Sequence, residues 1–135
     1  MSIDFKGFEE VIESLESLAD TSNLEAGLEK AALIVESAAK QKAPKGNGEL
    51  RRSITSKVEN LEGVVYTPLE YAPYVEYGTG LFAENGGRKD VPWNYKDDKG
   101  EWHSTSGMHP QPYMRPALDE NRNEIIKVIK ESIGK

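Results

Sequence analysis

The hydrophobic residues of this chain are spaced as in helices near both ends and alternate as in strands near the middle. From Phe5 to Leu18, apolar residues recur every three or four positions with glutamates between them, which predicts an amphipathic helix. Leucine, alanine and valine recur at the same spacing from about Leu24 to Lys42, which predicts a second helix. Because Pro44 cannot continue a helix and restricts the residue before it, the second helix should end there.

The middle of the chain has the turn residues and the alternation of a β-hairpin. Residues 45–48 read Lys-Gly-Asn-Gly, which predicts a tight turn. Side chains alternate from Ile54 to Glu59, as they do in a strand with two different faces. We expect residues 60–63 to form the hairpin turn and residues 64–67 the returning strand.

Shorter and less regular elements are predicted after this hairpin. Residues 71–80 read Tyr-Ala-Pro-Tyr-Val-Glu-Tyr-Gly-Thr-Gly, which predicts a short aromatic turn of helix closed by glycines. Residues 81–107 are polar and glycine-rich with no sustained period, although 93–95 and 101–103 could pair as a small hairpin. An amphipathic helix is predicted from Met114 almost to the C-terminus, with prolines around its first turn.

These elements together predict a single α+β domain covering residues 1–135. In this fold, a small antiparallel sheet packs against two long helices and a short helix, and residues 81–107 form a long flexible loop. A chain of 135 residues is long enough for one such domain with its own hydrophobic core.

Composition narrows the kinds of partner that the protein can have. The net charge is −6, with 23 acidic and 17 basic residues, which opposes electrostatic binding to the phosphates of DNA. A free nucleic-acid-binding protein is therefore not expected. The chain has no cysteine, so disulfides and thiolate metal sites are excluded. Neither a membrane-spanning segment nor a signal peptide is predicted, and we expect the protein to remain in the cytoplasm of the cell that makes it.

No segment of the sequence has the residue spacing of a known catalytic or metal-binding motif. His103 and His109 lack the spacing of a zinc site, and residues 97–100 lack the alternating oxygen ligands of a calcium loop. Gly78-Thr79-Gly80 is too short to cradle a phosphate. The sequence therefore predicts a protein that is not an enzyme and has no catalytic residue, cofactor or metal.

Three segments resemble the motifs of a large family of phage tail-component proteins. Residues 43–54 resemble its "AP…tG.L..SI" segment, residues 71–80 its "YA.yvE.GT" segment, and residues 111–118 its "qPFmrPAl" segment. Tyr113 stands where phenylalanine is frequent. The motif residues outside the second segment are Pro44, Gly48, Leu50, Arg51, Ser53, Ile54, Pro112, Tyr113, Met114 and Pro116.

The resemblance implies a structural protein of a bacteriophage or prophage virion. The family is similar to the minor tail protein Z of phage lambda and to the tail-completion proteins of siphophages. Such a protein would form a homo-oligomeric ring, expected to be hexameric, at the tail end or the head–tail neck, where it completes the tail and joins it to the head. The implied partners are sister subunits, the tail tube, the tail terminator and neck proteins, with DNA only as a passing, non-specific cargo. The implied location is the virion tail or neck, and the host cytoplasm during assembly.

The second motif and the polar loop supply the residues expected at an interface with sister subunits or tail partners. Tyrosines three positions apart line one side of a helical turn, and exposed tryptophans in a loop favour burial by a partner. The candidates are Tyr71, Tyr74, Glu76, Tyr77, Gly78, Thr79, Gly80, Trp93, Trp102 and Arg115. The tyrosines could instead cover the protein's own core, the glycines could form a helix cap and turn, and the arginine could be an ordinary solvated side chain.

Two further hypotheses concern charge. The acidic face formed by Glu9, Glu13 and Glu16 would repel DNA if it lined the lumen of a ring, and otherwise is a solvated outer face. The basic stretch from Lys45 to Lys57 allows an alternative function, that of a non-catalytic nucleic-acid-associated adaptor or binding module.

Overall fold

The computed structural model describes residues 1–5, 21–46, 48–84, 87 and 90–134. The chain divides into two compact units: unit 1 combines Met1–Leu69 with Tyr113–Lys135, and unit 2 is Glu70–Pro112. The single domain covering residues 1–135 stays a prediction. The α+β fold class is confirmed, because helices and small antiparallel sheets occur in the same chain.

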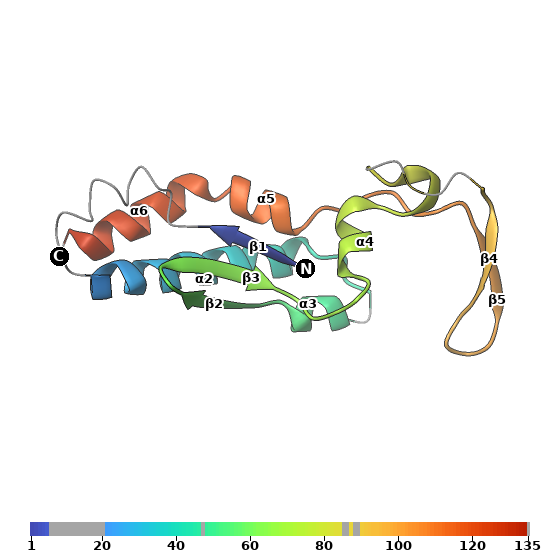
Figure 1. Ribbon diagram of the computed structural model, residues 1–135, viewed down its shortest axis with the longest axis horizontal. Helices are drawn as coiled ribbons and strands as arrows, with labels where there is room; N and C mark the ends of the chain where they lie inside the picture. Colours follow the sequence, from blue (N-terminus) through green and yellow to red (C-terminus); the bar gives the residue numbers. More distant parts are fainter. Residues whose placement is uncertain (6–20, 47, 85–86, 88–89, 135) are drawn as a thin grey trace. The chain divides into compact units, whose positions relative to one another are not determined.

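Unit 1 contains a three-stranded antiparallel sheet in the order β1-β3-β2 (Figure 1). The strands are β1 (Ser2–Phe5), β2 (Thr55–Glu59) and β3 (Glu62–Tyr66). The central strand β3 pairs Val65 with both Ile3 and Ser56, and the Val65 side chain is completely buried. The predicted hairpin is therefore present, and a third strand at the N-terminus extends it.

The hairpin turn is tighter than the sequence predicted. Asn60 and Leu61 both have positive φ, 52° and 59°, so the turn has two residues, and Glu62 and Gly63 belong to β3. Two consecutive positive φ values are the geometry of a type I′ turn, which matches the twist of the strands it connects. The predicted turn over 60–63 was too long because leucine rarely adopts this conformation and gives no signal for it.

The start of the chain also differs from its prediction. Phe5 is the last residue of β1 rather than the first residue of a helix, and its ring lies over Gly63 of the neighbouring strand. A Cβ atom built on Gly63 would lie 2.5 Å from Cζ of Phe5, so glycine is required for this contact. The rest of the helix predicted up to Leu18, including Glu9, Glu13 and Glu16, lies outside the described residues.

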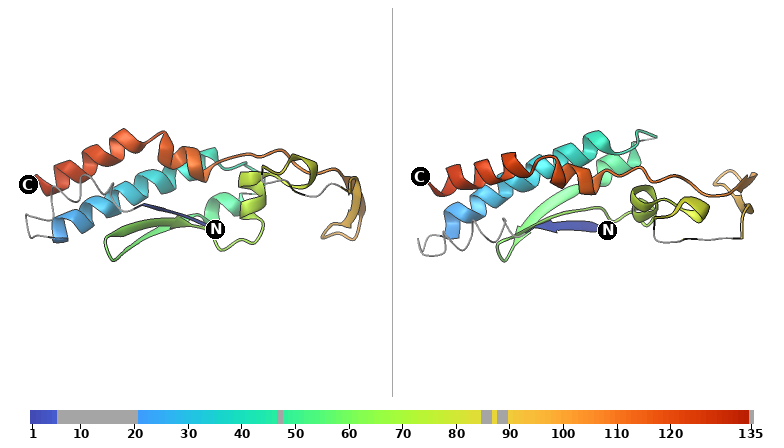
Figure 2. Two further views of the ribbon diagram at one scale, coloured as in Figure 1. Left: turned by 45° about the horizontal axis from the view of Figure 1, so that its top comes forward. Right: turned by 90° about the horizontal axis from the view of Figure 1, so that it is seen from above.

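The long helix α2 (Thr21–Lys42) connects the sheet to the C-terminal helices. It contacts β2 and β3 as well as α6 (Arg122–Ile133), and Figure 2 shows α6 running beside it. α2 approaches α6 closely at Gly27, where an added Cβ would lie 3.1 Å from Cβ of Ser132. The buried side chains of α2 have the predicted helical spacing: Leu24, Leu28, Ala31, Ala32, Val35 and Ala39.

The sequence prediction missed one short helix and merged two others into one. α3 (Glu49–Ser53) lies between the predicted turn at residues 45–48 and the predicted strand, where no element was predicted, and Ile54 ends this helix rather than starting a strand. The predicted C-terminal helix is two helices, α5 (Met114–Asp119) and α6, separated at Asn121. Asn121 Nδ2 donates to the carbonyl of Ala117 at 2.8 Å. Asparagine side chains compete in this way with backbone hydrogen bonds, which explains the break.

Unit 2 contains the predicted aromatic helix and the predicted small hairpin. The helix is α4 (Ala72–Tyr77), and it is followed by a 3₁₀ turn, η2 (Gly80–Phe82). Strands β4 (Trp93–Lys96) and β5 (Trp102–Thr105) pair with each other as a two-stranded antiparallel sheet. The segment 81–107 is thus partly regular, and its flexibility stays a prediction.

Within the residues that the structure describes, no helix combines the length and the apolar character needed to cross a membrane.

Candidate assembly surface

The tyrosines of the second motif lie at the surface of unit 2. Tyr71 precedes the first residue of α4, and Tyr74 and Tyr77 lie within the helix. All three side chains are exposed, Tyr74 to the extent of 58%. On the same short helix, Ala72, Val75 and Glu76 are buried. The helix therefore separates an exposed aromatic side from a buried side, and the candidate Glu76 belongs to the buried one.

Gly78 and Gly80 have positive φ values, 82° and 60°. The segment that approaches them in the structure is the protein's own residues 106–110. Thr79 N donates to Met108 O at 2.9 Å and Leu81 N donates to Ser106 O at 2.9 Å. A Cβ atom on Gly80 would lie 2.8 Å from Cη2 of Trp93, so the second glycine allows the base of the hairpin to pack against the turn.

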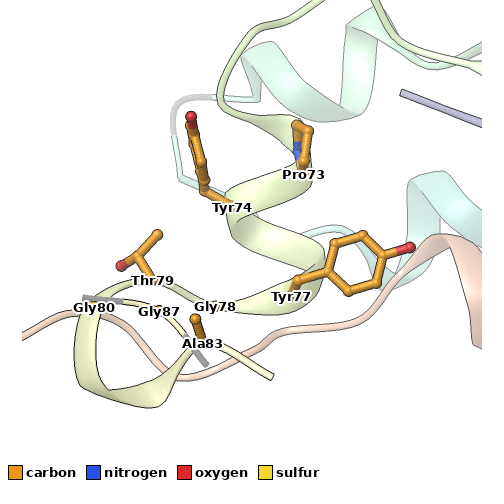
Figure 3. A pocket seen from close by; sticks show the side chains of 8 residues that line it. All are labelled: Pro73, Tyr74, Tyr77, Gly78, Thr79, Gly80, Ala83 and Gly87. Atoms are coloured by element: carbon orange, nitrogen blue, oxygen red, sulfur yellow. The ribbon is translucent and has the colours of Figure 1, made fainter. Parts of the chain in front are cut away.

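A hollow of about 300 Å³ opens beside these glycines. In Figure 3 the rings of Tyr74 and Tyr77 project from α4, while Thr79 and Ala83 come from the segment that follows it. The remaining lining residues are Pro73, Gly78, Gly80 and Gly87. Six residues of the second motif thus contribute to one concave, partly aromatic surface.

The β4–β5 hairpin carries a second group of exposed aromatic side chains. Trp102 is 69% exposed and Tyr95 46%, whereas Trp93 is partly buried. Lys96 and Trp102 are cross-strand partners, and the Lys96 ammonium lies 5.9 Å from the centre of the Trp102 ring. Tyr95 and His103 are paired on the other face, where their rings stack at 5.3 Å. Because side chains alternate across a strand, Trp102 and Tyr95 face opposite sides of the hairpin.

The turn of this hairpin is organised by Asp97. Its Oδ1 accepts hydrogen bonds from the backbone N–H groups of Lys99 and Glu101, at 2.9 and 2.8 Å. Its Oδ2 lies 2.7 Å from Nε2 of His103. The contact with His103, followed by the backbone hydrogen bonds, lowers the pKa of the Asp97 carboxyl below its ordinary value of 3.8. The hydrogen-bonded carboxylate stabilises the turn that presents Trp102.

The hairpin also brings together Asp97, Glu101 and His103, whose potential ligand atoms lie within 4.8 Å of one another. The sequence prediction of no metal site did not consider this set, because strand pairing rather than sequence spacing creates it. Both oxygens of Asp97 and Nε2 of His103 already take part in the hydrogen bonds that hold the turn. Those bonds account for the cluster as a structural feature of the hairpin.

The first motif has a structural role in unit 1. Gly48, with φ of 81°, leads into α3, where Leu50 is buried and Ile54 follows as a buried residue. Ser53 Oγ donates to Leu50 O at 2.6 Å and lies 2.7 Å from Oγ1 of Thr67, which links α3 to the end of the hairpin. The remaining motif residues are Pro44, which follows α2, and Arg51, whose Nε is buried without a hydrogen-bond partner among the described residues.

Most of the third motif, from Tyr113 onward, lies in unit 1. Tyr113 and Met114 are completely buried, and the Tyr113 hydroxyl points to Sδ of Met1 at 3.7 Å. Pro112 is exposed, and Pro116 falls within the first turn of α5, where its missing N–H is tolerated. Arg115 is half-buried and forms an interaction within the chain, so its role toward a sister subunit stays a prediction.

The basic stretch that suggested nucleic-acid binding is partly neutralised within unit 1. Lys57 Nζ lies 3.5 Å from Oε1 of Glu59 and 5.6 Å from the centre of the Tyr66 ring. A lysine engaged in this way contributes less to phosphate binding than a free one.

The chain thus combines an α+β fold with an exposed aromatic surface in unit 2. Residues 9–78, more than half of the chain, match the HK97-gp10-like family, described as "Bacteriophage HK97-gp10, putative tail-component". The chain belongs to this family of phage tail components, and its place is therefore the virion tail. The matched region includes the first motif and most of the second. Similarity to the minor tail protein Z stays a prediction.

No curated protein and no solved structure matches the chain at a significant level.

Proposed function

We propose that this tail component assembles with copies of itself into a ring at the end of the tail that meets the head. There it completes the tail and joins it to the head. Its partners are sister subunits, in a ring expected to be hexameric, together with the tail tube and the terminator or neck proteins. DNA passes through the ring without specific binding. Membership in the tail-component family supports the structural role and the location in the tail.

The observation that carries this proposal is the uneven distribution of apolar side chains. Eight large hydrophobic side chains of the described residues are exposed, and seven of them lie in unit 2. In contrast, only two of the 18 buried hydrophobic residues of the described chain, Ala72 and Val75, lie there. A soluble monomer gains nothing from such a surface, whereas aromatic residues at this density are typical of the centre of protein interfaces.

The residue types also favour a protein partner over a small molecule. Tyrosine and tryptophan contribute large contact areas and lose little conformational entropy on binding, and a hydroxyl or N–H remains available for hydrogen bonds. A standard interface takes about 800 Å² from each partner. A ring subunit must form two such contacts, one with each neighbour, which accounts for aromatic residues on both α4 and the hairpin.

Removing the encoding gene from its phage tests the proposal. We expect cells infected with the deletion phage to accumulate filled heads and separate tails, and a plasmid copy of the gene to restore joined virions. Electron microscopy of the lysate measures the fraction of joined particles. Joined, infectious virions in the absence of the protein would contradict the proposed function.

A further inference from the structure

We propose that Trp102 of one copy inserts into the tyrosine-lined hollow of a second copy, and that this contact repeats around the assembly. The inference rests on the proposed function, because it specifies which surfaces of neighbouring subunits meet. It concerns two surfaces of unit 2: the Trp102 face of the β4–β5 hairpin and the hollow beside α4.

The Trp102 face has the properties of an anchor. Trp102 is the most exposed of the exposed large hydrophobic residues in the described chain. By strand alternation, it shares its face with Asn94, Lys96 and Ser104, so the strand positions on this face include one base and no acid. Four residue pairs join the strands of the hairpin and hydrogen bonds to Asp97 close its turn, so the strand register determines which side chains share this face.

The hollow has the size and lining to receive one aromatic side chain. Its volume of about 300 Å³ is at the lower limit of pockets that bind small ligands, roughly 300–1,000 Å³. Tyr74, Tyr77 and Pro73 belong to its lining, and Figure 3 shows the two tyrosine rings projecting from α4 in different directions. Aromatic pairs add about 0.5–1.5 kcal/mol beyond the area they bury, which favours an aromatic occupant.

One acidic residue lies beside the hollow. Glu84 is exposed, and its backbone N–H donates to O of the lining residue Tyr77 at 3.0 Å. Glu76 on the same helix is buried, and the bases Arg88 and Lys89 follow the lining residue Gly87 in the sequence. The Lys96 ammonium lies close to the Trp102 ring, so insertion of the ring would bring a positive charge toward Glu84.

The occupant is assigned to a second copy because the two surfaces are different and occur on the same chain. In the described structure, Trp102 is exposed and does not line the hollow. A contact between different surfaces of identical subunits is heterologous, so each subunit uses its Trp102 toward one neighbour and its hollow toward the other. Such contacts close into a ring when the rotation between subunits allows it.

Site-directed cross-linking tests the contact, and the chain has no native cysteine to interfere. Ser104→Cys places a thiol on the Trp102 face, and Ala83→Cys places one in the lining of the hollow. The two variants are mixed, free in solution and on isolated tails, and treated with a short bismaleimide. We expect a cross-linked dimer in the mixture, and its loss when Trp102→Ala is added to the Ser104→Cys chain.

The matched single variants give the quantitative test. Trp102→Ala should weaken self-association by at least about tenfold, whereas Leu33→Ala, in unit 1 and 58% exposed, should leave it unchanged. Circular dichroism confirms that both variants remain folded. Rings that form without the cross-link, or that form equally well with Trp102→Ala, would overturn this contact but leave the proposed function standing. Absence of any ring on tails carrying the unsubstituted protein would overturn both.

Discussion

At the scale of single residues, the motifs differ in whether their side chains are buried in the protein or exposed. Leu50, Ile54, Tyr113 and Met114 are buried in unit 1 and explain why the first and third motifs have the residues they do. The exposed tyrosines of the second motif have no comparable role in the protein's own core. Sequence spacing could not predict which motif residues are buried and which are exposed, because an aromatic residue in a motif is equally suited to a core and to an interface.

Gly63 provides a direct test of packing at the residue scale. Gly63→Ala places a methyl group against the Phe5 ring, so we expect the free energy of unfolding to fall by about 1–3 kcal/mol, the usual effect of overpacking. Urea denaturation measures the change. Adding Phe5→Leu removes the ring and should make the alanine substitution less costly. If the cost of the alanine is the same in both backgrounds, the two residues are not in contact.

The Asp97 carboxyl makes the hairpin turn sensitive to acid. Because its pKa is lowered in the folded chain, its contribution is fully present above the ordinary value of 3.8 and is lost as the pH falls through the lower, folded value. We expect the amide signals of Lys99 and Glu101, which donate to this carboxylate, to titrate with a midpoint below 3.8 in NMR spectra. Asp97→Asn should remove this transition. A midpoint at or above 3.8 would show that the hydrogen bonds are not formed.

At the scale of elements, length decided what the sequence could predict. The helix α2 and the region of α6 were predicted because their apolar spacing continues over several turns. α3 has five residues and β1 four, too few for a period to be recognised. The β4–β5 hairpin was predicted from its turn residues, but the meeting of Asp97, Glu101 and His103 depends on strand register and was not.

The contact between α2 and α6 holds the C-terminus of unit 1 in place. Ile129 is completely buried on α6, so we expect Ile129→Ala to lower the free energy of unfolding by about 2–5 kcal/mol. Thermal denaturation followed by circular dichroism measures the loss. Lys130→Ala, on the exposed side of the same helix, is the control and should change stability by less than about 0.5 kcal/mol. Equal effects of the two substitutions would show that α6 is not docked as described.

The hairpin should be needed for assembly but not for the stability of unit 1. Replacing residues 94–104 with a short glycine-serine turn removes Tyr95 and Trp102 but keeps the hydrogen bonds of Thr79 and Leu81 to residues 106–108. We expect the unfolding transition to change little and ring formation to be lost, as followed by sedimentation velocity in the presence of tails. Normal ring formation by this variant would exclude the hairpin from the interface.

At the scale of the whole molecule, the chain has one unit with a hydrophobic core and one unit with an exposed aromatic surface. Unit 1 contains most of the buried hydrophobic residues of the described chain, and unit 2 contains most of the exposed ones. The α+β class and the family could be predicted from the sequence, since periodicity and motifs are local properties. The hollow beside α4 could not, because its lining depends on how the turn after the helix folds back.

Electron microscopy of tails carrying the protein is the most direct test of whether it forms a ring at the end of the tail that meets the head. Tails isolated from the deletion phage are incubated with the purified protein and imaged, and averaged end views measure the number and arrangement of added subunits. The account predicts a closed ring of identical subunits at the end of the tail that meets the head. Tails that bind the protein as scattered single copies, along their length or at the opposite end, would contradict it.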